Sequence, residues 1–444
     1  MNMLTGPLLK PMVMFALPLI ATGVLQQSFN SVDVAVLGRF VGSHALAAVG
    51  STGPVVGLIV NLFVGLAVGV NVVIANYIGQ ANGEGIRKAM GASSVLAIAS
   101  GLLMLALGEA ICRPLLELLG TPELVIDDAE TYMRIFVCGL PPMMIYNFAA
   151  AVLRSVGDTR TPFYSLVAAG VLNVVLNLLF VIVFHMGVAG VAWATVISNV
   201  LNALILVTVL RHRNGDIHLD FRAMKPNWPQ MKKIIGIGLP AGLQGAVFAM
   251  SNALILSSIN SFGANATAGS AAAINYEFYC YFIISAFAQT AVAFISQNYG
   301  AGNYDRIRRI FRLALILGVG SGFVLNVLIT WQKDFFLEVF TDDAAALVFG
   351  RTRIVCVLMF QFIATYYEVA ASAMRGMGRS MTPTVIVICG TCVLRVLWVM
   401  VYPLFGGQFW QLMFVYPASW LLTDVMMWLA YRHVVRVAIP VTKA

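Results

Sequence analysis

The sequence RSVGDTRTP at residues 154–162 returns as RGMGRSMTP at residues 375–383, at an offset of 221 residues (from 154 to 375). The same offset carries IGQAN at residues 78–82 onto YGAGN at residues 299–303. Long apolar segments surround both copies, so the repeat indicates a membrane protein built from two related lobes. In transporters of this kind the cargo binds between the repeats, and the repeat therefore predicts a transporter.

The composition is that of an integral membrane protein. Of the 444 residues, 60% are hydrophobic and only 10% are charged, against roughly 25% charged residues in soluble proteins. About twelve apolar segments approach or exceed the roughly 20 residues that cross a bilayer as a helix. We place them at residues 11–38, 44–76, 88–112, 131–151, 162–185, 188–210, 234–259, 264–297, 309–331, 348–372, 382–403 and 409–431.

Six of these segments fall in each half of the chain. An even number of crossings returns the chain to its starting side, so the second half should repeat the first in the same orientation. We therefore predict an all-α integral membrane fold of two six-helix lobes related by a pseudo-twofold axis along the membrane normal. The first lobe is expected at residues 1–210, a polar interlobe linker at 211–233 and the second lobe at 234–444.

Charged residues are sorted between the two sides of the predicted membrane. Lys and Arg gather in the loops on one side, together with the linker and both termini, whereas the opposite loops are acidic. Basic loops face the cytoplasm in membrane proteins, so both termini are expected to be cytoplasmic. This topology accounts for the net charge of +8, and no nucleic-acid partner is needed to explain it.

Polar side chains inside the first apolar segment are the first candidates for function. A charge at membrane depth costs at least about 2.5 kcal/mol, so a retained one usually has a role. Asp33 is preceded by Asn30 and Gln26, which share its helix face as supporting polar groups. Farther along, Asn173 and Asn177 are four residues apart in an apolar segment and also share a face.

Thr195, in the next segment, would add a hydroxyl group to this set. A carboxylate, two amide oxygens and a hydroxyl suit a hard cation, with Na⁺ held by Asp33, Asn173 and Asn177. They suit equally a carboxyl group that carries a proton. The sequence thus predicts a coupling-ion site in the first lobe, with a hydrogen-bonded polar core as the alternative.

The second lobe carries a different set of charged residues. Glu277, Glu368 and Arg395 lie inside apolar segments, and Asp424 lies nearer a membrane interface. The carboxylates are candidates to bind a cationic cargo or a coupling cation. Arg395 would instead be structural if it neutralised one of them in a buried pair.

Two repeated local features concern the helices themselves. Pro18 and Pro240 fall inside the first apolar segment of each half, where a residue without an N–H weakens a helix. Matched breaks of this kind mark either moving helices or static kinks. In the repeated Arg-Gly-Thr-Pro element, Thr161 is expected to cap a helix with Pro162 in its first turn.

These features resemble the multidrug and toxic compound extrusion (MATE) family, in its bacterial NorM-like and DinF-like forms. The resemblance rests on SVDVAVLG at residues 31–38, both copies of the Arg-Gly-Thr-Pro element and SQNYGAG at residues 296–302, and it covers essentially the whole chain. It implies two six-helix bundles in a bacterial inner membrane. It also implies cation-driven antiport of amphipathic, often cationic compounds out of the cell.

The resemblance also bears on the site residues. Asp33 matches the first-helix acid of the family, and Asn173, Asn177 and Thr195 match the rest of its first-lobe cation site by spacing. Some members carry Asp where Asn177 stands, which leaves sodium and proton coupling both open. The seventh-helix Glu of NorM-like members is absent, so a second-lobe site would have to be rebuilt around Glu277 and Glu368.

Two other protein classes fit the composition less well. A flippase for lipid-linked precursors would need basic residues in its central cavity, and Arg395 is the only deep one expected. A membrane enzyme would need convergent His, Cys or Asp side chains, and the five His residues are dispersed. We therefore expect no enzymatic activity, no cofactor beyond the coupling Na⁺ or H⁺, and a monomer that carries small-molecule cargo across the lipid bilayer.

Overall fold

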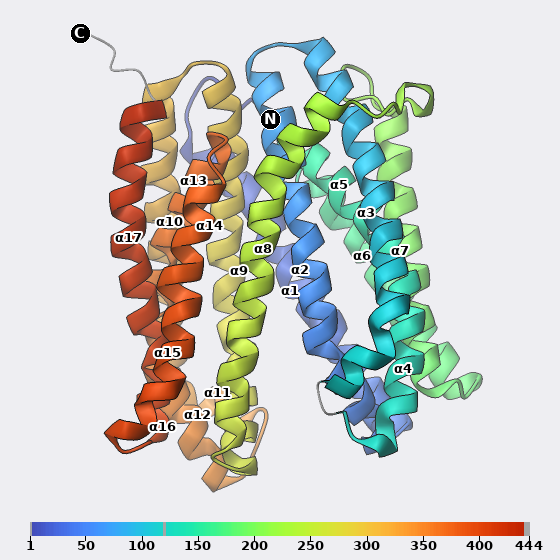
Figure 1. Ribbon diagram of the computed structural model, residues 1–444, viewed down its shortest axis with the longest axis vertical. Coiled ribbons are helices and arrows are strands. Elements are labelled where there is room, and N and C mark those ends of the chain that lie inside the picture. The colour runs from blue at the N-terminus through green and yellow to red at the C-terminus, as the bar shows by residue number, and fades with distance from the viewer. Residues whose placement is uncertain (1, 119–120, 439–444) are drawn as a thin grey trace. The chain divides into compact units, whose positions relative to one another are not determined.

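The computed structural model describes residues 2–118 and 121–438, and all secondary structure in these ranges is helical (Figure 1). Among the described residues, 11 helices are long and apolar enough to cross a membrane, or up to 12 with one bent pair counted as a span. The all-α membrane fold expected from the sequence is thereby confirmed.

The helices of the first half are α1 (Leu9–Phe40), α2 (Ser43–Gly79), α3 (Gly83–Leu118), α4 (Glu123–Cys138), α5 (Leu140–Ser155), α6 (Arg160–Leu178), the π-helical η1 (Leu179–Val183) and α7 (Gly187–His212). After the short 3₁₀ turn η2 (Phe221–Ala223), the second half contains α8 (Trp228–Asn260), α9 (Ala264–Gly300), α10 (Tyr304–Trp331), α11 (Lys333–Glu338), α12 (Ala344–Cys356), the 3₁₀ helix η3 (Leu358–Ala364), α13 (Thr365–Gly376), α14 (Met381–Val387), the π-helical η4 (Ile388–Val393), α15 (Leu394–Val401), the 3₁₀ helix η5 (Tyr402–Phe405), α16 (Phe409–Met413) and α17 (Val415–Ala438).

The internal repeat is visible in the backbone. Helices α2 and α9 begin and end at residues related by the 221-residue offset. Positive φ angles recur at the same offset in four pairs of turn residues: Gly42 and Gly263, Ala81 and Gly302, Gly157 and Gly378, His185 and Gly406. Residues other than Gly rarely adopt this conformation. The turns have therefore kept their geometry even where the residue type differs between the halves.

One expected span is not a straight helix. The apolar segment at residues 131–151 is divided between α4 and α5, which meet at Gly139 with a bend of 43°. Pro141 and Pro142 occupy the first turn of α5. Proline has no N–H and its ring clashes with the preceding turn, so α4 cannot continue through them.

The chain forms two compact units. Residues 21–242 form the first unit, whereas residues 2–20 group with the chain from Leu243 onward in the second unit. This grouping differs from the sequence division at 211–233, because α1 and α8 each belong to both units. Each of these helices changes unit within a few residues of its internal proline, Pro18 or Pro240.

The first part of α8 packs against α2 within the first unit through glycine. A Cβ atom added at Gly65 would lie 2.1 Å from the backbone nitrogen of Gly242, and one at Gly69 would lie 2.2 Å from the carbonyl oxygen of Ile234. The matching contact in the second unit is made with side chains, since Ala16 of α1 packs with Ala286 of α9.

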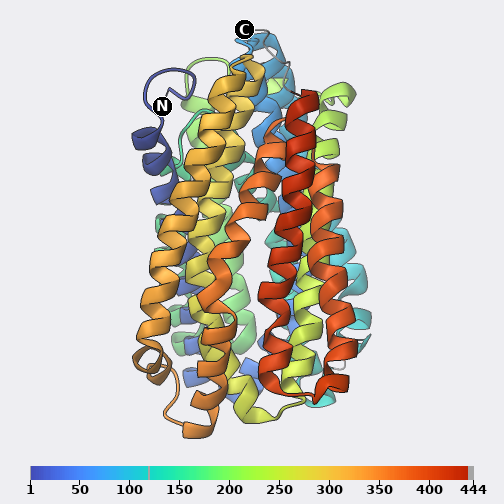
Figure 2. The same cartoon turned by 90° about the vertical axis from the view of Figure 1, so that its left-hand side faces the viewer.

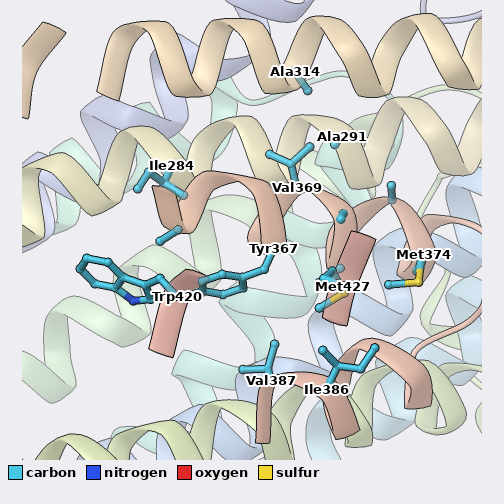
Figure 3. Packing of buried hydrophobic residues seen from close by; sticks show 14 of the residues in the cluster. Ile284, Ala291, Ala314, Tyr367, Val369, Met374, Ile386, Val387, Trp420 and Met427 are labelled. Carbon is cyan, nitrogen blue, oxygen red and sulfur yellow. The ribbon is translucent and has the colours of Figure 1, made fainter. Parts of the chain in front are cut away.

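Each unit has its own apolar core. In the second unit, side chains from α9, α10, α13, α14 and α17 converge, among them Tyr367, Val369, Trp420 and Met427 (Figure 3). The helices of this unit, yellow to red in Figure 2, run alongside one another. The first unit has a separate core built from α2, α3, α4, α5 and α7.

The turn between α5 and α6 is stabilised by Asp158. Its carboxylate accepts hydrogen bonds from the backbone N–H of Thr161 (3.0 Å) and from the Thr161 hydroxyl (2.9 Å). Arg213, at the end of α7, donates to the same carboxylate at 2.7 Å. The expected cap by Thr161 is wrong, because Thr161 lies inside α6 and Asp158 precedes the helix.

Candidate cation site

Asp33 lies in the part of α1 that belongs to the first unit, and its side chain is partly buried. The side-chain amide of Asn177 donates a hydrogen bond to Oδ1 of Asp33 and another, of 3.2 Å, to Oδ1 of Asn173. Asn173 in turn donates to the hydroxyl oxygen of Thr195 at 3.5 Å. The structure thus brings four predicted residues from α1, α6 and α7 into one chain of hydrogen bonds.

Local packing allows α1 to approach α6 at this level. Gly170 lies one turn before Asn173 on α6, and a Cβ atom there would lie 1.8 Å from the ring of Phe29 on α1. Only glycine leaves room for that ring. Thr195 donates its hydroxyl to the carbonyl oxygen of Val191 at 3.1 Å, which leaves the lone pairs of the hydroxyl oxygen available to Asn173.

The amide oxygen of Asn177 is the unusual atom of the cluster. Asn177 is 0% exposed, and in the part of the chain that the structure describes its Oδ1 has no hydrogen-bond partner. Both amide hydrogens are used by Asp33 and Asn173, so the oxygen is the atom left over. A buried acceptor without a partner costs about 1–3 kcal/mol. Satisfying it takes a cation or a hydrogen-bond donor within reach of this oxygen.

Gln26 and Asn30, two of the predicted supporting residues, are not joined to this chain of hydrogen bonds within the described ranges. Gln26 and Asn30 are both exposed, and no hydrogen bond joins either of them to Asp33 in the described residues. Tyr132 of α4, which was not among the predicted residues, packs in the apolar cluster that also contains Val32 of α1. One tyrosine among 14 gave no pattern by which to find it.

In the second unit, Glu277 of α9 is held in an ion pair with Arg353 of α12. The two pairs of atoms, Nε to Oε1 and Nη2 to Oε2, lie 2.6 and 2.9 Å apart. Arg353 is 2% exposed and its guanidinium also lies over the ring of Tyr416. Arg353 was not among the predicted residues, although an arginine inside the apolar segment 348–372 was a signal for it.

Arg395 does not make the carboxylate pair considered from the sequence. Its guanidinium donates to the neutral oxygens of Asn252 (2.7 Å) and Ser419 (3.3 Å) and lies 4.6 Å from the ring centroid of Tyr416. Arg395 was also expected to be the only deep basic residue, but Arg353 and Arg375 are buried as well.

The two remaining acids have separate surroundings. Asp424 of α17 accepts a hydrogen bond from the backbone N–H of Tyr367 at 3.0 Å, in the first turn of α13. Such N–H groups have no partner within their own helix, so Asp424 satisfies one of them. Glu368 lies in the same turn. Among the described residues it shares no hydrogen bond or ion pair with Glu277 or Arg395.

Comparison with known proteins places these features in a family. The family model MatE matches residues 18–179 and 240–401, well over half of the chain and once in each half. The chain is 28% identical over 386 residues to the probable multidrug resistance protein YoeA of Bacillus subtilis, covering 85% of this chain and 83% of that protein. It is 27% identical over 384 residues to the probable multidrug resistance protein NorM of Thermotoga maritima, covering 85% and 82%.

Among solved structures, the fold is similar to the outward-facing conformation of a multidrug resistance MATE family transporter of the MOP superfamily. The TM-score is 0.91 at 21% identity, and 98% of each chain is covered. This likeness concerns the fold, whereas the two MatE matches concern the sequence of both halves. The chain therefore belongs to the MatE family, whose members are membrane transporters and not enzymes.

Proposed function

We propose that this protein is an antiporter that exports amphipathic, cationic organic compounds and is driven by Na⁺ or H⁺ bound at Asp33. The observation that carries the proposal is a carboxylate at membrane depth with oxygen-bearing neighbours and no cation of its own. Among the described residues, no Lys, Arg or His lies within ion-pairing distance of Asp33. A charge retained there needs a positive partner, which the solution can supply.

The position of Asp33 on α1 supports a coupling role. The segment of α1 that carries Asp33 belongs to the first unit, whereas the segment before Ala21 belongs to the second. A cation that changes the hydrogen bonds of Asp33 therefore acts on a helix that is continuous with both units. If the cation favours one arrangement of α1 and the cargo favours the other, each ligand lowers the affinity for the other.

The cargo class and the membrane placement belong to the same proposal. Two relatives are named probable multidrug resistance proteins, and export of amphipathic cations fits both that description and the resemblance described above. The proposal also includes a monomer in a bacterial inner membrane. Both termini are assigned to the cytoplasm because they lie on the same side as the basic loops, and basic loops face the cytoplasm in membrane proteins.

The test is efflux of a fluorescent cationic dye from proteoliposomes under an imposed Na⁺ gradient or an imposed proton gradient. The wild type should move the dye with one of the two gradients, which identifies the coupling ion. Asp33→Asn keeps the size of the side chain but removes its charge, and should abolish the gradient-driven component. Asn177→Val should weaken ion dependence, because it removes both the donor to Asp33 and the oxygen that lacks a partner.

The control is Asp127→Asn, which neutralises an exposed carboxylate of the first unit with a side chain 84% accessible. It should transport dye like the wild type. Equal gradient-driven efflux by Asp33→Asn and the wild type would show that the coupling role assigned to Asp33 is wrong.

A further inference from the structure

A cleft of about 310 Å³ lies between α10 and α17 in the second unit. Four exposed arginines line it, namely Arg308 and Arg312 from α10 and Arg432 and Arg436 from α17. Phe311 and Tyr431 are buried beneath them, stacked with ring centroids 4.2 Å apart. The cleft therefore combines an apolar base with a positively charged opening.

The charge of this cleft is not balanced within the protein. Each helix contributes two arginines that are four residues apart and so point to the same side. In the part of the chain that the structure describes, none of the four lies within 4.0 Å of a carboxylate oxygen. Two other exposed arginines, Arg113 and Arg134, are by contrast each shared between acidic side chains.

The position of the arginines along the helices matches the depth of lipid headgroups. Helix α10 begins at Tyr304 and α17 ends at Ala438, so all four arginines lie within about three turns of a helix terminus. In a membrane-spanning helix, this is the zone between the hydrocarbon core and water. Anionic headgroups are found at this depth, and soluble ions also reach it.

The surface below the arginines is apolar and open. One turn beyond Arg312 on α10, Ile316 is 67% exposed. On α17, Trp428 lies one turn and Val425 two turns deeper than Arg432, and their side chains are 45% and 52% exposed. The guanidinium of Arg432 lies over the Trp428 ring. A stripe that changes from charged to apolar along two helices fits a ligand with a charged head and long apolar chains.

We propose that this cleft binds the headgroup of an anionic phospholipid, with its phosphate oxygens between the two arginine pairs. Guanidinium groups bind phosphate oxygens through paired N–H donors, which suits four arginines on two facing helices. The acyl chains lie along the exposed apolar stripes of α10 and α17. Basic clefts between helices at a membrane surface are a general means of retaining such lipids.

The test is native mass spectrometry of the purified full-length protein with dioleoylphosphatidylglycerol or with dioleoylphosphatidylcholine, which has the same chains but no net charge. The wild type should retain the anionic lipid in preference. In Arg312→Gln/Arg432→Gln, one charge from each helix is removed, and the affinity for phosphatidylglycerol should fall about tenfold. Arg312→Lys/Arg432→Lys keeps the charge and should retain part of the preference, which separates charge from misfolding.

The matched control is Arg309→Gln/Arg222→Gln, which removes the same charge from exposed arginines outside the cleft and should leave the preference unchanged. Soluble glycerol 3-phosphate at the concentration of the lipid should not displace it, because it lacks acyl chains. The proposal is overturned if the wild type holds both lipids equally, if the glutamine variant in the cleft binds like the wild type, or if glycerol phosphate displaces the lipid.

Discussion

The two halves have matching helix bounds and turn conformations, but they differ in how charged side chains at membrane depth are paired. In the first unit, the carboxylate of Asp33 is bonded to the neutral amide of Asn177. In the second unit, the positions 221 residues after Asp33 and Asn177 are Leu254 and Trp398, which are apolar or aromatic. One acid of that unit, Glu277, is instead neutralised by an arginine of the chain itself.

The same offset relates the arginine that pairs with Glu277 to a position in the first unit. Arg353 stands 221 residues after Tyr132, the tyrosine that packs beside α1 in the first unit, and Tyr416 stands 221 residues after Thr195. Arg353 and Arg395 both lie over the ring of Tyr416. The second unit therefore holds guanidinium groups in the region that corresponds to the oxygen cluster of the first. A built-in cation stabilises a fold, whereas an acid without one is able to bind an exchangeable cation.

The largest effect should come from breaking the built-in pair. In Arg353→Met the carboxylate of Glu277 stays buried without its partner, and we expect a loss of about 3–5 kcal/mol of stability. The melting temperature of the purified protein in detergent measures it. The double variant Arg353→Met/Glu277→Met should recover most of the loss, because neither charge then remains buried alone.

Arg351 supplies the control for this comparison. It lies two residues earlier on α12 and pairs with Asp334 at 2.6 Å, but both side chains are about half exposed. Arg351→Met should change stability by less than about 1 kcal/mol. Similar losses for the two single variants would mean that the pair of Glu277 and Arg353 is no more structural than a surface pair.

A second difference between the halves is the glycine contact of the first unit. Ala286 stands where the first half has Gly65, yet Gly65→Ala would drive a Cβ atom to 2.1 Å from the backbone nitrogen of Gly242. We expect this substitution to cost about 1–3 kcal/mol, since two helix backbones must move apart. Gly57→Ala on the same helix meets nothing within 4 Å and should be neutral or slightly stabilising in the same melting assay.

Much of the fold could be predicted from the sequence because it depends on local signals. Apolar length gave the spans, and the repeated motif gave the duplication that the helix bounds and the turns at Gly157 and Gly378 show. The bend between α4 and α5 was missed although Pro141 and Pro142 signalled it. Membership of α1 and α8 in both units was not predictable, since it depends on contacts between segments distant in sequence.

The candidate site divides in a similar way. Asp33, Asn173 and Asn177 stand out because an acid or amide is rare in an apolar helix, and the structure joins them by hydrogen bonds. The arrangement around Glu277 was not found, because the pairing of an acid with one arginine out of several depends on which helices pack together. Arg395 was the arginine considered, and Arg353 is the one that binds.

The smallest expected effect concerns the repeated turn. In the first half Asp158 is partly buried, which by itself raises its pKa, but the hydrogen bonds from Arg213 and Thr161 outweigh burial and hold the pKa below its usual value. The turn of the second half has Arg379 at the corresponding place, which is exposed.

A lowered carboxyl pKa stabilises the fold at neutral pH, and this contribution is lost as the pH falls through the folded-state pKa. Asp158→Asn should therefore cost about 1 kcal/mol at pH 7, and the gap to the wild type should close as the pH falls below about 4. Arg379→Asn should show no such pH dependence between these limits. A gap for Asp158→Asn that persists unchanged at low pH would mean that the turn depends on the shape of the side chain and not on its charge.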